Sequence, residues 1–376
     1  MKILYMVNVP APYMVNYFNE LGKYCELTVI FEKATSTERD KSWSEYNFIN
    51  FRGIILKGIS TAVDMAFCPQ IVKYLKKGVY DFIISSTMAT PTGIVAIEYM
   101  KLRGIPYYLE SEGGFAKDGK GLKEKIKKIV MSGATGYFST TPIGDNYFIT
   151  YGADRNKIYK YPFTSLYKED ILLEPVDDLK KTYIRKELGI IEEKMIISVG
   201  QFIHRKGFDV LIKSASKLDK NIGIYIIGGE PSAEYIELKN KCNALNIHFV
   251  GFKNKQQLSE YYKAADLFVL PTREDIWGLV INEAMAYGLP VITTNRCIAG
   301  IELIDFENGD IITVDSEKEL TDSIKRIIFD KNKLRKMGES SLEKIQWYTF
   351  ENMAKVHMDF FNRGNVNERK TMYGEK

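Results

Sequence analysis

The chain has 376 residues, of which 45% are apolar and 27% are charged. At roughly 150 residues per domain this length predicts two globular domains, and the composition excludes a disordered chain. Lysine and arginine number 52 and aspartate and glutamate 48, so the formal charge of +4 is too small for a dedicated nucleic-acid-binding protein.

Short apolar runs rich in β-branched and aromatic residues recur along the chain, with helix-like spacers between them. The first half contains runs at 2–7, 26–31, 81–86, 106–111 and 136–141. The second half contains runs at 195–200, 222–229, 247–252, 267–272, 290–294 and 310–314. Continuous apolar strands that alternate with helices are typical of parallel sheets covered on both faces. The sequence therefore predicts an α/β protein with two doubly wound, Rossmann-like domains.

A charged stretch without a strand pattern separates the two series near 165–190. We therefore predict an N-terminal domain over 1–165 and a C-terminal domain over 166–345. Residues 346–376 have a helical pattern that ends in a polar tail.

Residue types that build metal and redox sites are scarce. The four cysteines lie far apart without a CxxC pair, so neither a zinc site nor a disulfide framework is predicted. With three histidines in the chain, a multi-histidine metal centre is not expected. The N-terminal run is typical of a first strand rather than a signal peptide, and no run of about 18 apolar residues occurs. A cytoplasmic location is expected.

The turn after the first predicted strand, at 8–12, contains no glycine. The dinucleotide-binding pattern GxGxxG is therefore missing where it is needed, and GxxxxGK[ST] occurs nowhere in the chain. Dehydrogenase and P-loop NTPase functions lose their main support.

The strongest signal follows the strand predicted at 267–272. Asp275 lies on the loop after this strand, Gly278 precedes a helix, and Glu283 lies within that helix. Ligands of open α/β sheets bind at the carboxyl ends of the strands, and a helix N-terminus presents free N–H groups to an anion. Two acids in these positions suit the hydroxyl groups of one extended ligand.

This stretch resembles the donor-site signature of retaining GT-B glycosyltransferases, particularly glycosyltransferase family 4. In that family an acid, seven residues and a glutamate precede the pattern AMA-x-G-x-P-V. The chain meets it with Asp275, Glu283, Ala284, Met285, Ala286, Gly288, Pro290 and Val291. The family's first acid is usually glutamate, and Glu274, one residue out of register, is the rival of Asp275.

A second block at 198–218 matches the family's diphosphate loop, in which Arg205 and Lys206 suit a diphosphate. The family often has an arginine where this chain has Gln201. The positive charge expected beside the phosphates is therefore supplied by Arg205 and Lys206. The resemblance implies catalytic roles for Arg205, Lys206, Asp275 and Glu283, without a metal. The implied donor-binding residues are Gly200, Gln201, Gly228, Gly229, Glu230, Ile276, Trp277, Gly278, Leu279 and Val280.

The resemblance also implies that the two domains face each other across a cleft, with the acceptor bound by the first domain. A terminal helix around 350–363 is expected to cross back to that domain. The residues expected at the acceptor cleft are Pro12, Glu110, Glu112 and Gly113. For Glu110, a structural role stays open beside the functional one.

Residues 117–131 carry six lysines and two acids, a net charge of +4. They supply most of the +6 of residues 1–165, which hold 21 basic and 15 acidic side chains. An apolar helical stripe is formed by Leu122, Ile126, Ile129 and Val130, and the other face carries Lys123, Lys125, Lys127 and Lys128. Either the stripe is core and the lysines are solvated, which we favour slightly, or the lysines bind anionic lipid headgroups.

These inferences predict a retaining hexosyltransferase that uses a UDP- or GDP-sugar and no cofactor. Its expected acceptor is a glycan or a lipid-linked glycan of cell-surface polysaccharide or lipopolysaccharide, reached from the cytoplasmic face of the membrane by peripheral binding. No nucleic-acid partner is expected. The alternative is a non-catalytic protein that binds sugar nucleotides or polysaccharide on the same fold. A sugar-nucleotide epimerase ranks third, because its acid–base chemistry usually draws on histidines that are scarce here.

Overall fold

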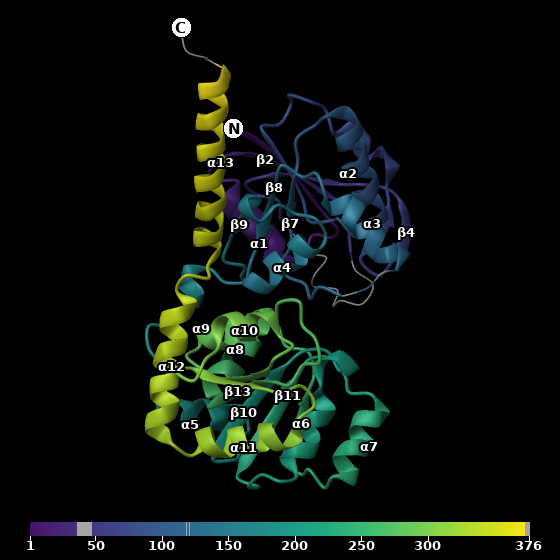
Figure 1. The fold of residues 1–376 in the computed structure, drawn as a ribbon. Helices are drawn as coiled ribbons and strands as arrows, with labels where there is room; N and C mark the ends of the chain where they lie inside the picture. Colours follow the sequence, from purple (N-terminus) through teal and green to yellow (C-terminus); the bar gives the residue numbers. More distant parts are fainter. Residues whose placement is uncertain (36–46, 118, 120, 373–376) are drawn as a thin grey trace. The chain divides into compact units, whose positions relative to one another are not determined.

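The computed structural model describes residues 1–35, 47–117, 119 and 121–372, with side chains described as far as residue 363 in the last helix. The chain divides into two compact units (Figure 1). Unit 1 comprises Met1–Thr164 and the segment from Thr349 onward, and unit 2 comprises Ser165–Tyr348. These limits lie close to the domain limits expected after residues 165 and 345.

Unit 1 contains a parallel sheet with the strand order β3-β2-β1-β6-β7-β8-β9. Its strands are β1 (Lys2–Val7), β2 (Glu26–Phe31), β3 (Arg52–Ile55), β6 (Phe82–Ser85), β7 (Tyr108–Glu110), β8 (Gly136–Ser139) and β9 (Ile158–Lys160). A separate antiparallel hairpin consists of β4 (Ile59–Ala62) and β5 (Met65–Phe67). The central strand β1 is buried along its length after Lys2, as expected of a strand covered on both faces.

Three of the helices of unit 1 begin where the sequence supplies start signals. Prolines stand at the start of all three, and Thr90 and Thr141 cap two by accepting hydrogen bonds from the N–H groups of Gly93 and Gly144. The helices of the unit are α1 (Pro12–Leu21), α2 (Pro91–Arg103), α3 (Leu122–Met131), α4 (Pro142–Thr150) and α13 (Phe350–Met372), with 3₁₀ turns η2 (Pro69–Lys73) and η3 (Arg155–Lys157).

The terminal helix α13 packs on α1 and on the sheet of unit 1 (Figure 1). Its Phe361 is fully buried, with the ring centroid 4.7 Å from that of Phe82 on β6. The return of the chain to the first unit, which the resemblance implied, is therefore realised by apolar contacts of α13.

Unit 2 contains a parallel sheet with the order β12-β11-β10-β13-β14-β15. Its strands are β10 (Lys194–Val199), β11 (Ile222–Ile227), β12 (Ile247–Val250), β13 (Leu267–Leu270), β14 (Val291–Thr294) and β15 (Gly309–Ile312). Its helices are α5 (Asp178–Glu187), α6 (Phe208–Ala215), α7 (Ala233–Lys241), α8 (Lys255–Ala264), α9 (Leu279–Ala286), α10 (Ile298–Leu303), α11 (Glu317–Ile328) and α12 (Lys331–Ile345), with η4 (Lys168–Asp170) and η5 (His204–Lys206).

Both sheets have the doubly wound order, in which the strand sequence reverses beside the first strand. The reversal lies between β1 and β6 in unit 1 and between β10 and β13 in unit 2. The loops that leave the carboxyl ends of these strands run to opposite sides, which is why ligands of such folds bind there. This rule directs attention to the loops after β10 and β13.

Every predicted apolar run contains a strand, but β3, β4, β5 and β9 were not predicted. Each of these strands has only three or four residues, and most of their residues are exposed or half-buried. They lack the continuous apolar run that identifies a buried parallel strand. Among the described residues, no helix has the length and apolar character needed to cross a bilayer.

Candidate functional site

Two loops meet at the strand-order reversal of unit 2. The loop after β10 contains η5, and the loop after β13 runs from 271 to 278. The backbone N–H of Arg273 and the hydroxyl of Thr272 both donate to the carbonyl of Arg205, each at 2.8 Å. Gly207, with φ of 70°, approaches so closely that a Cβ there would lie 2.0 Å from the carbonyl oxygen of Pro271. The two loops therefore form one structural element.

Asp275 joins both cations of the predicted diphosphate loop. Its Oδ2 lies 2.6 Å from Lys206 Nζ, and its Oδ1 lies 3.2 Å from Arg205 Nη1. The carboxylate of Asp275 and the ammonium of Lys206 are nearly buried, whereas the Arg205 side chain is 45% exposed. Two positive charges share one negative charge, so the cluster keeps a positive excess for an anionic ligand.

Glu274, the rival for the first acid position, lies elsewhere. Its Oε2 is 2.8 Å from Arg296 Nη2, and both side chains are half-buried. Only its backbone carbonyl takes part in the loop, where it accepts a hydrogen bond from Arg205 Nη1 at 2.9 Å. The contacts therefore favour Asp275 for the role that the resemblance assigns to the first acid.

Gly278 leads into α9 with φ of 102°, and a Cβ there would lie 2.9 Å from Cys297 Sγ. Leu279 and Val280, in the first turn of α9, are half-buried, and Ile276 is largely exposed. The expectation that the Trp277 side chain contacts the donor is corrected. This side chain is buried, and its Nε1 donates a hydrogen bond to Asn282 Oδ1 at 2.8 Å. Trp277 supports the loop from the interior.

Glu283 lies in α9 but has different partners from Asp275. Its carboxylate accepts hydrogen bonds from Tyr262 Oη at 3.1 Å and Ser165 Oγ at 3.3 Å. Burial raises the pKa of Glu283 above its ordinary value, and these two hydrogen bonds offset only part of the increase. The structure thus places Glu283 in a hydroxyl-lined environment, separate in its contacts from the cation cluster.

The remaining predicted donor residues lie at the ends of β10 and β11. Gly228 approaches Gly200 so closely that a Cβ would lie 1.9 Å from the Gly200 carbonyl oxygen, whereas a Cβ on Gly229 would meet open space. Gln201 and Glu230 are exposed, and Glu230 Oε1 lies beside Gly251 after β12. These residues border the same carboxyl edge of the sheet as the cation cluster.

In unit 1, the expected position of Glu110 in an open acceptor cleft is wrong. Its side chain is 2% exposed, and its Oε2 lies 3.1 Å from Tyr5 Oη and 3.2 Å from His357 Nε2 on α13. His357 is itself buried and its Nδ1 lies 2.8 Å from the Met353 carbonyl. The helix that returns from the end of the chain covers this carboxylate, which supports the structural alternative.

The other predicted acceptor residues lie together at the carboxyl ends of β1 and β7. Pro12 is the first residue of α1, and the neighbouring Tyr13 donates from Oη to Glu112 Oε1 at 3.0 Å. Gly113 has φ of 152° and is buried. Pro12 and the half-buried Glu112 reach the surface, so they remain candidates for acceptor contact.

The helix α3 corrects the interpretation that we favoured slightly. Leu122, Ile126 and Ile129 are 74%, 41% and 58% exposed, so only Val130 of the predicted stripe is core. The lysines also differ from one another: Lys123, Lys125 and Lys128 are exposed, whereas Lys127 Nζ lies over the rings of Tyr147 and Tyr151, at 5.6 and 5.0 Å. Asp118 and Lys120 of the charged segment lie outside the described residues.

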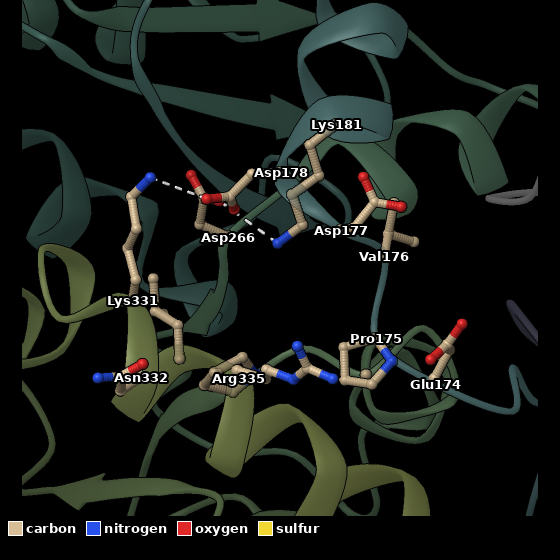
Figure 2. Close-up of a pocket in the computed structure, with 13 residues that line it drawn as sticks. Glu174, Pro175, Val176, Asp177, Asp178, Lys181, Asp266, Lys331, Asn332 and Arg335 are labelled. Carbon is tan, nitrogen blue, oxygen red and sulfur yellow. Dashed lines mark hydrogen bonds and ion pairs between the residues drawn. The ribbon is translucent and has the colours of Figure 1, made fainter.

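A cavity of about 390 Å³ lies at the opposite edge of unit 2, beside Asp266 before β13 and Pro290 before β14. Figure 2 shows Lys181 and Lys331 directed at acids of the same cavity. Lys181 Nζ lies 3.4 Å from the Asp266 carboxylate, and Lys331 Nζ lies 2.9 Å from that of Asp178. These cations are neutralised within the lining, in contrast with the positive excess at the carboxyl edge.

Several residues of the candidate site were missed by sequence reasoning: Arg273, Asp209, Arg296, Tyr262 and Ser165. Arg273 stands two residues before Asp275, and an acid in the first turn of α6 is visible in the sequence. Their pairing, across 64 positions of the chain, is not visible in the sequence.

The described part of the chain contains no group of three or more histidine, cysteine, aspartate or glutamate side chains that could hold a metal ion. Metal independence stays a prediction.

The class of the protein follows from the two doubly wound sheets and from known structures. The chain is similar to HepE from Anabaena in complex with UDP, with a TM-score of 0.78, 15% identity, and coverage of 96% of this chain and 100% of that chain. At this identity the likeness shows the fold, which is the GT-B fold of two Rossmann-like units.

Residues 180–344 match the family "Glycosyl transferases group 1". The D-inositol 3-phosphate glycosyltransferase of Corynebacterium glutamicum is 28% identical over 209 residues, 52% of this chain and 50% of that protein. The lipopolysaccharide glucosyltransferase WaaG of Escherichia coli is 27% identical over 176 residues, 45% of this chain and 46% of that protein. The matches thus span about half the length of these curated relatives. Residues 180–344, within unit 2, are therefore similar to the group 1 glycosyltransferases, and the fold of the chain is GT-B.

Proposed function

We propose that the protein transfers a hexose from a nucleoside diphosphate sugar to a hydroxyl group of a glycan, with retention of the anomeric configuration. The observation that supports the proposal is the cluster of Arg205, Lys206 and Asp275. It carries a positive excess and lies at the strand-order reversal of the region that matches the group 1 family. A diphosphate would exchange with Asp275 for the two cations.

The proposed chemistry places each charged group at a point where charge develops. As the bond between the anomeric carbon and the phosphate oxygen breaks, its electron pair moves to the diphosphate, where Arg205 and Lys206 stabilise it. The N-terminus of α9 adds its dipole. The acceptor oxygen attacks the anomeric carbon from the same face, and its proton passes to the departing phosphate. Asp275 would hold sugar hydroxyls and Glu283 the ribose, without a metal ion.

The test is an assay of a panel of UDP- and GDP-sugars with glycan acceptors, followed by NMR of the anomeric proton in the product. We expect transfer from one donor class, retention, and full activity in EDTA. Donor binding without transfer or hydrolysis would favour a non-catalytic sugar-nucleotide-binding protein. Epimerised donor would point to the third alternative, and an inverted product would exclude the retaining mechanism.

We further propose that the acceptor is lipid-linked and that α3 docks the protein on the anionic cytoplasmic face of a membrane. Three apolar side chains of α3 face solvent beside three exposed lysines, an arrangement suited to reversible interfacial binding. Each lysine near an anionic surface contributes about 1 kcal/mol. The named activity of the similar WaaG, lipopolysaccharide glucosylation, supports a cell-surface glycan as the product.

Vesicles of phosphatidylcholine with and without phosphatidylglycerol test this docking. We expect sedimentation with the anionic vesicles that weakens as salt rises from 0.1 to 1 M, because the Debye length falls from about 10 to about 3 Å. Replacing Lys123, Lys125 and Lys128 with glutamine should reduce sedimentation and spare donor binding. Lys127→Gln is the matched control, since its ammonium already lies over two tyrosine rings. Equal sedimentation of the triple variant and the wild type would favour a soluble acceptor.

A further inference from the structure

Arg273 connects four segments of unit 2 around the candidate diphosphate site. Its Nη1 and Nη2 form a bidentate pair with the Asp209 carboxylate at 2.8 and 2.7 Å, and its Nε lies 2.8 Å from Asp315 Oδ1. Its Nη1 also donates to the His204 carbonyl at 2.7 Å, and its backbone N–H donates to the Arg205 carbonyl at 2.8 Å. All three guanidinium nitrogens are engaged.

These partners hold both ends of the loop that carries Arg205 and Lys206. His204 begins η5, and Asp209 lies in the first turn of α6, just after Gly207. Arg273 itself stands two residues before Asp275, on the other loop of the site. One side chain therefore fixes the spacing between the cations and their carboxylate partner.

The bonding pattern requires arginine rather than lysine. A planar fork forms two parallel hydrogen bonds to one carboxylate and leaves Nε for a second, whereas an ammonium group is a point charge. Burial alone would raise the pKa of Asp209, but the hydrogen bonds and charge of Arg273 outweigh it and hold the pKa below its ordinary value. The pair is thus ionised at neutral pH, and Arg273 is not free to bind a phosphate directly.

We propose that Arg273 is a positioning residue for donor binding, which holds the Arg205–Lys206 loop in register with the Asp275 loop through Asp209. This inference rests on the proposed use of a nucleoside diphosphate sugar. It deepens that function by assigning donor affinity to a residue outside the signature that the resemblance supplied.

The role has a consequence that a general contribution to stability would not have. A loosened loop leaves the cations on the protein but lets them sample orientations in which they do not meet both phosphates. Donor KM should therefore rise while acceptor KM stays unchanged. A merely structural role would lower the active fraction, and hence kcat, without moving the donor KM.

The experiment compares wild type, Arg273→Lys and Asp209→Asn by calorimetric titration with UDP and GDP and by steady-state kinetics with the active donor. Arg326→Lys is the matched control, because Arg326 pairs with Asp310 on the same unit and is largely exposed. We expect about tenfold weaker nucleotide binding and a raised donor KM for both site variants, little change for the control, and similar melting temperatures.

The outcomes separate the two proposals. Wild-type protein that binds neither UDP nor GDP and transfers no sugar would overturn the proposed function, and the positioning role with it. If the wild type binds a nucleotide and Arg273→Lys binds it with the same affinity, the positioning role alone is overturned. If Arg273→Lys does not fold, Asp209→Asn, which preserves the side-chain volume, decides between the same outcomes.

Discussion

The two units have the same strand order up to the sixth position of the sheet but treat the acids at their carboxyl edges differently. In unit 2, Asp275 is paired with the cations Arg205 and Lys206. In unit 1, Glu110 has Tyr5 and His357 as partners, and Glu32 after β2 accepts a hydrogen bond from the hydroxyl of Thr90 at 2.5 Å. Unit 2 keeps a partly exposed cation, Arg205, at this edge, whereas unit 1 buries Glu110 and Glu32 against hydroxyl and imidazole groups without a lysine or arginine partner among their described contacts.

This difference shows that topology specifies where a ligand can bind but not whether the side chains suit it. Unit 2 has positive charge at the reversal point, which is why the proposed donor site lies there. Two acids of unit 1, Glu110 and Glu32, are buried in internal hydrogen bonds, whereas Pro12 and Glu112 reach the surface, where acceptor contact stays a prediction. Four measurements can sharpen or break this contrast.

The largest effect is expected at the cation cluster. Lys206→Ala should lower kcat/KM by about a hundredfold to a thousandfold, because it removes a nearly buried charge that, in the proposed mechanism, stabilises the leaving group. Circular dichroism should show an intact fold. Lys217→Ala is the matched control, since Lys217 forms an exposed pair with Glu317 on the same unit. Unchanged turnover of Lys206→Ala would remove the diphosphate assignment.

The second prediction compares two histidine–glutamate pairs. His357→Ala should lower the free energy of unfolding by about 3–5 kcal/mol, because it strips one partner from a carboxylate that is fully buried. His248→Ala should cost about 1 kcal/mol or less, because His248 is 37% exposed where it meets Glu192 at 2.5 Å. Urea unfolding measures both. Equal losses would contradict the claim that α13 covers the Glu110 carboxylate. Nucleotide binding should be unaffected by either change.

The same contrast explains how far the sequence could lead. The strands of unit 2 are continuous apolar runs, and the cations and acid of the site follow two of them, so their convergence at one edge was predictable. The burial of Glu110 was not, because it depends on His357, which lies 247 residues later in the chain. The Arg273–Asp209 pair could not be predicted either, because the two residues lie 64 positions apart and no pattern between them specifies their register.

The third prediction concerns pH. Burial raises the pKa of Glu32 to about 7, and hydrogen bonds from Thr90, the Ala66 N–H and Thr87 offset only part of that effect. Between the ordinary value of 4.5 and about 7 the folded protein binds more protons than the unfolded chain, so stability falls as pH rises through this window. Above pH 8 the loss should approach about 3 kcal/mol.

Glu32→Gln should therefore be more stable than wild type at pH 8 and nearly equal to it at pH 4.5, as chemical unfolding across this range can measure. Glu26→Gln is the control, because Glu26 begins the same strand with its side chain 69% exposed and pairs with Lys2. Parallel pH profiles for Glu32→Gln and wild type would mean that burial does not raise the pKa of this carboxylate as described.

The smallest change in the free energy of unfolding is expected for substitutions on α3, and a small value would show that the exposed stripe does not belong to the core. Replacing Leu122, Ile126 and Ile129 with glutamine should change the free energy of unfolding by no more than about 0.5 kcal/mol each, because these side chains face solvent and glutamine is a good helix former. Val130→Ala, on the same helix but buried, should cost about 1–3 kcal/mol. If the triple variant were as destabilised as Val130→Ala, the stripe would belong to the core of unit 1. If instead the triple variant kept its stability but no longer sedimented with anionic vesicles, the exposed stripe would serve docking. Folding would then give no reason for three solvent-facing apolar side chains on one helix.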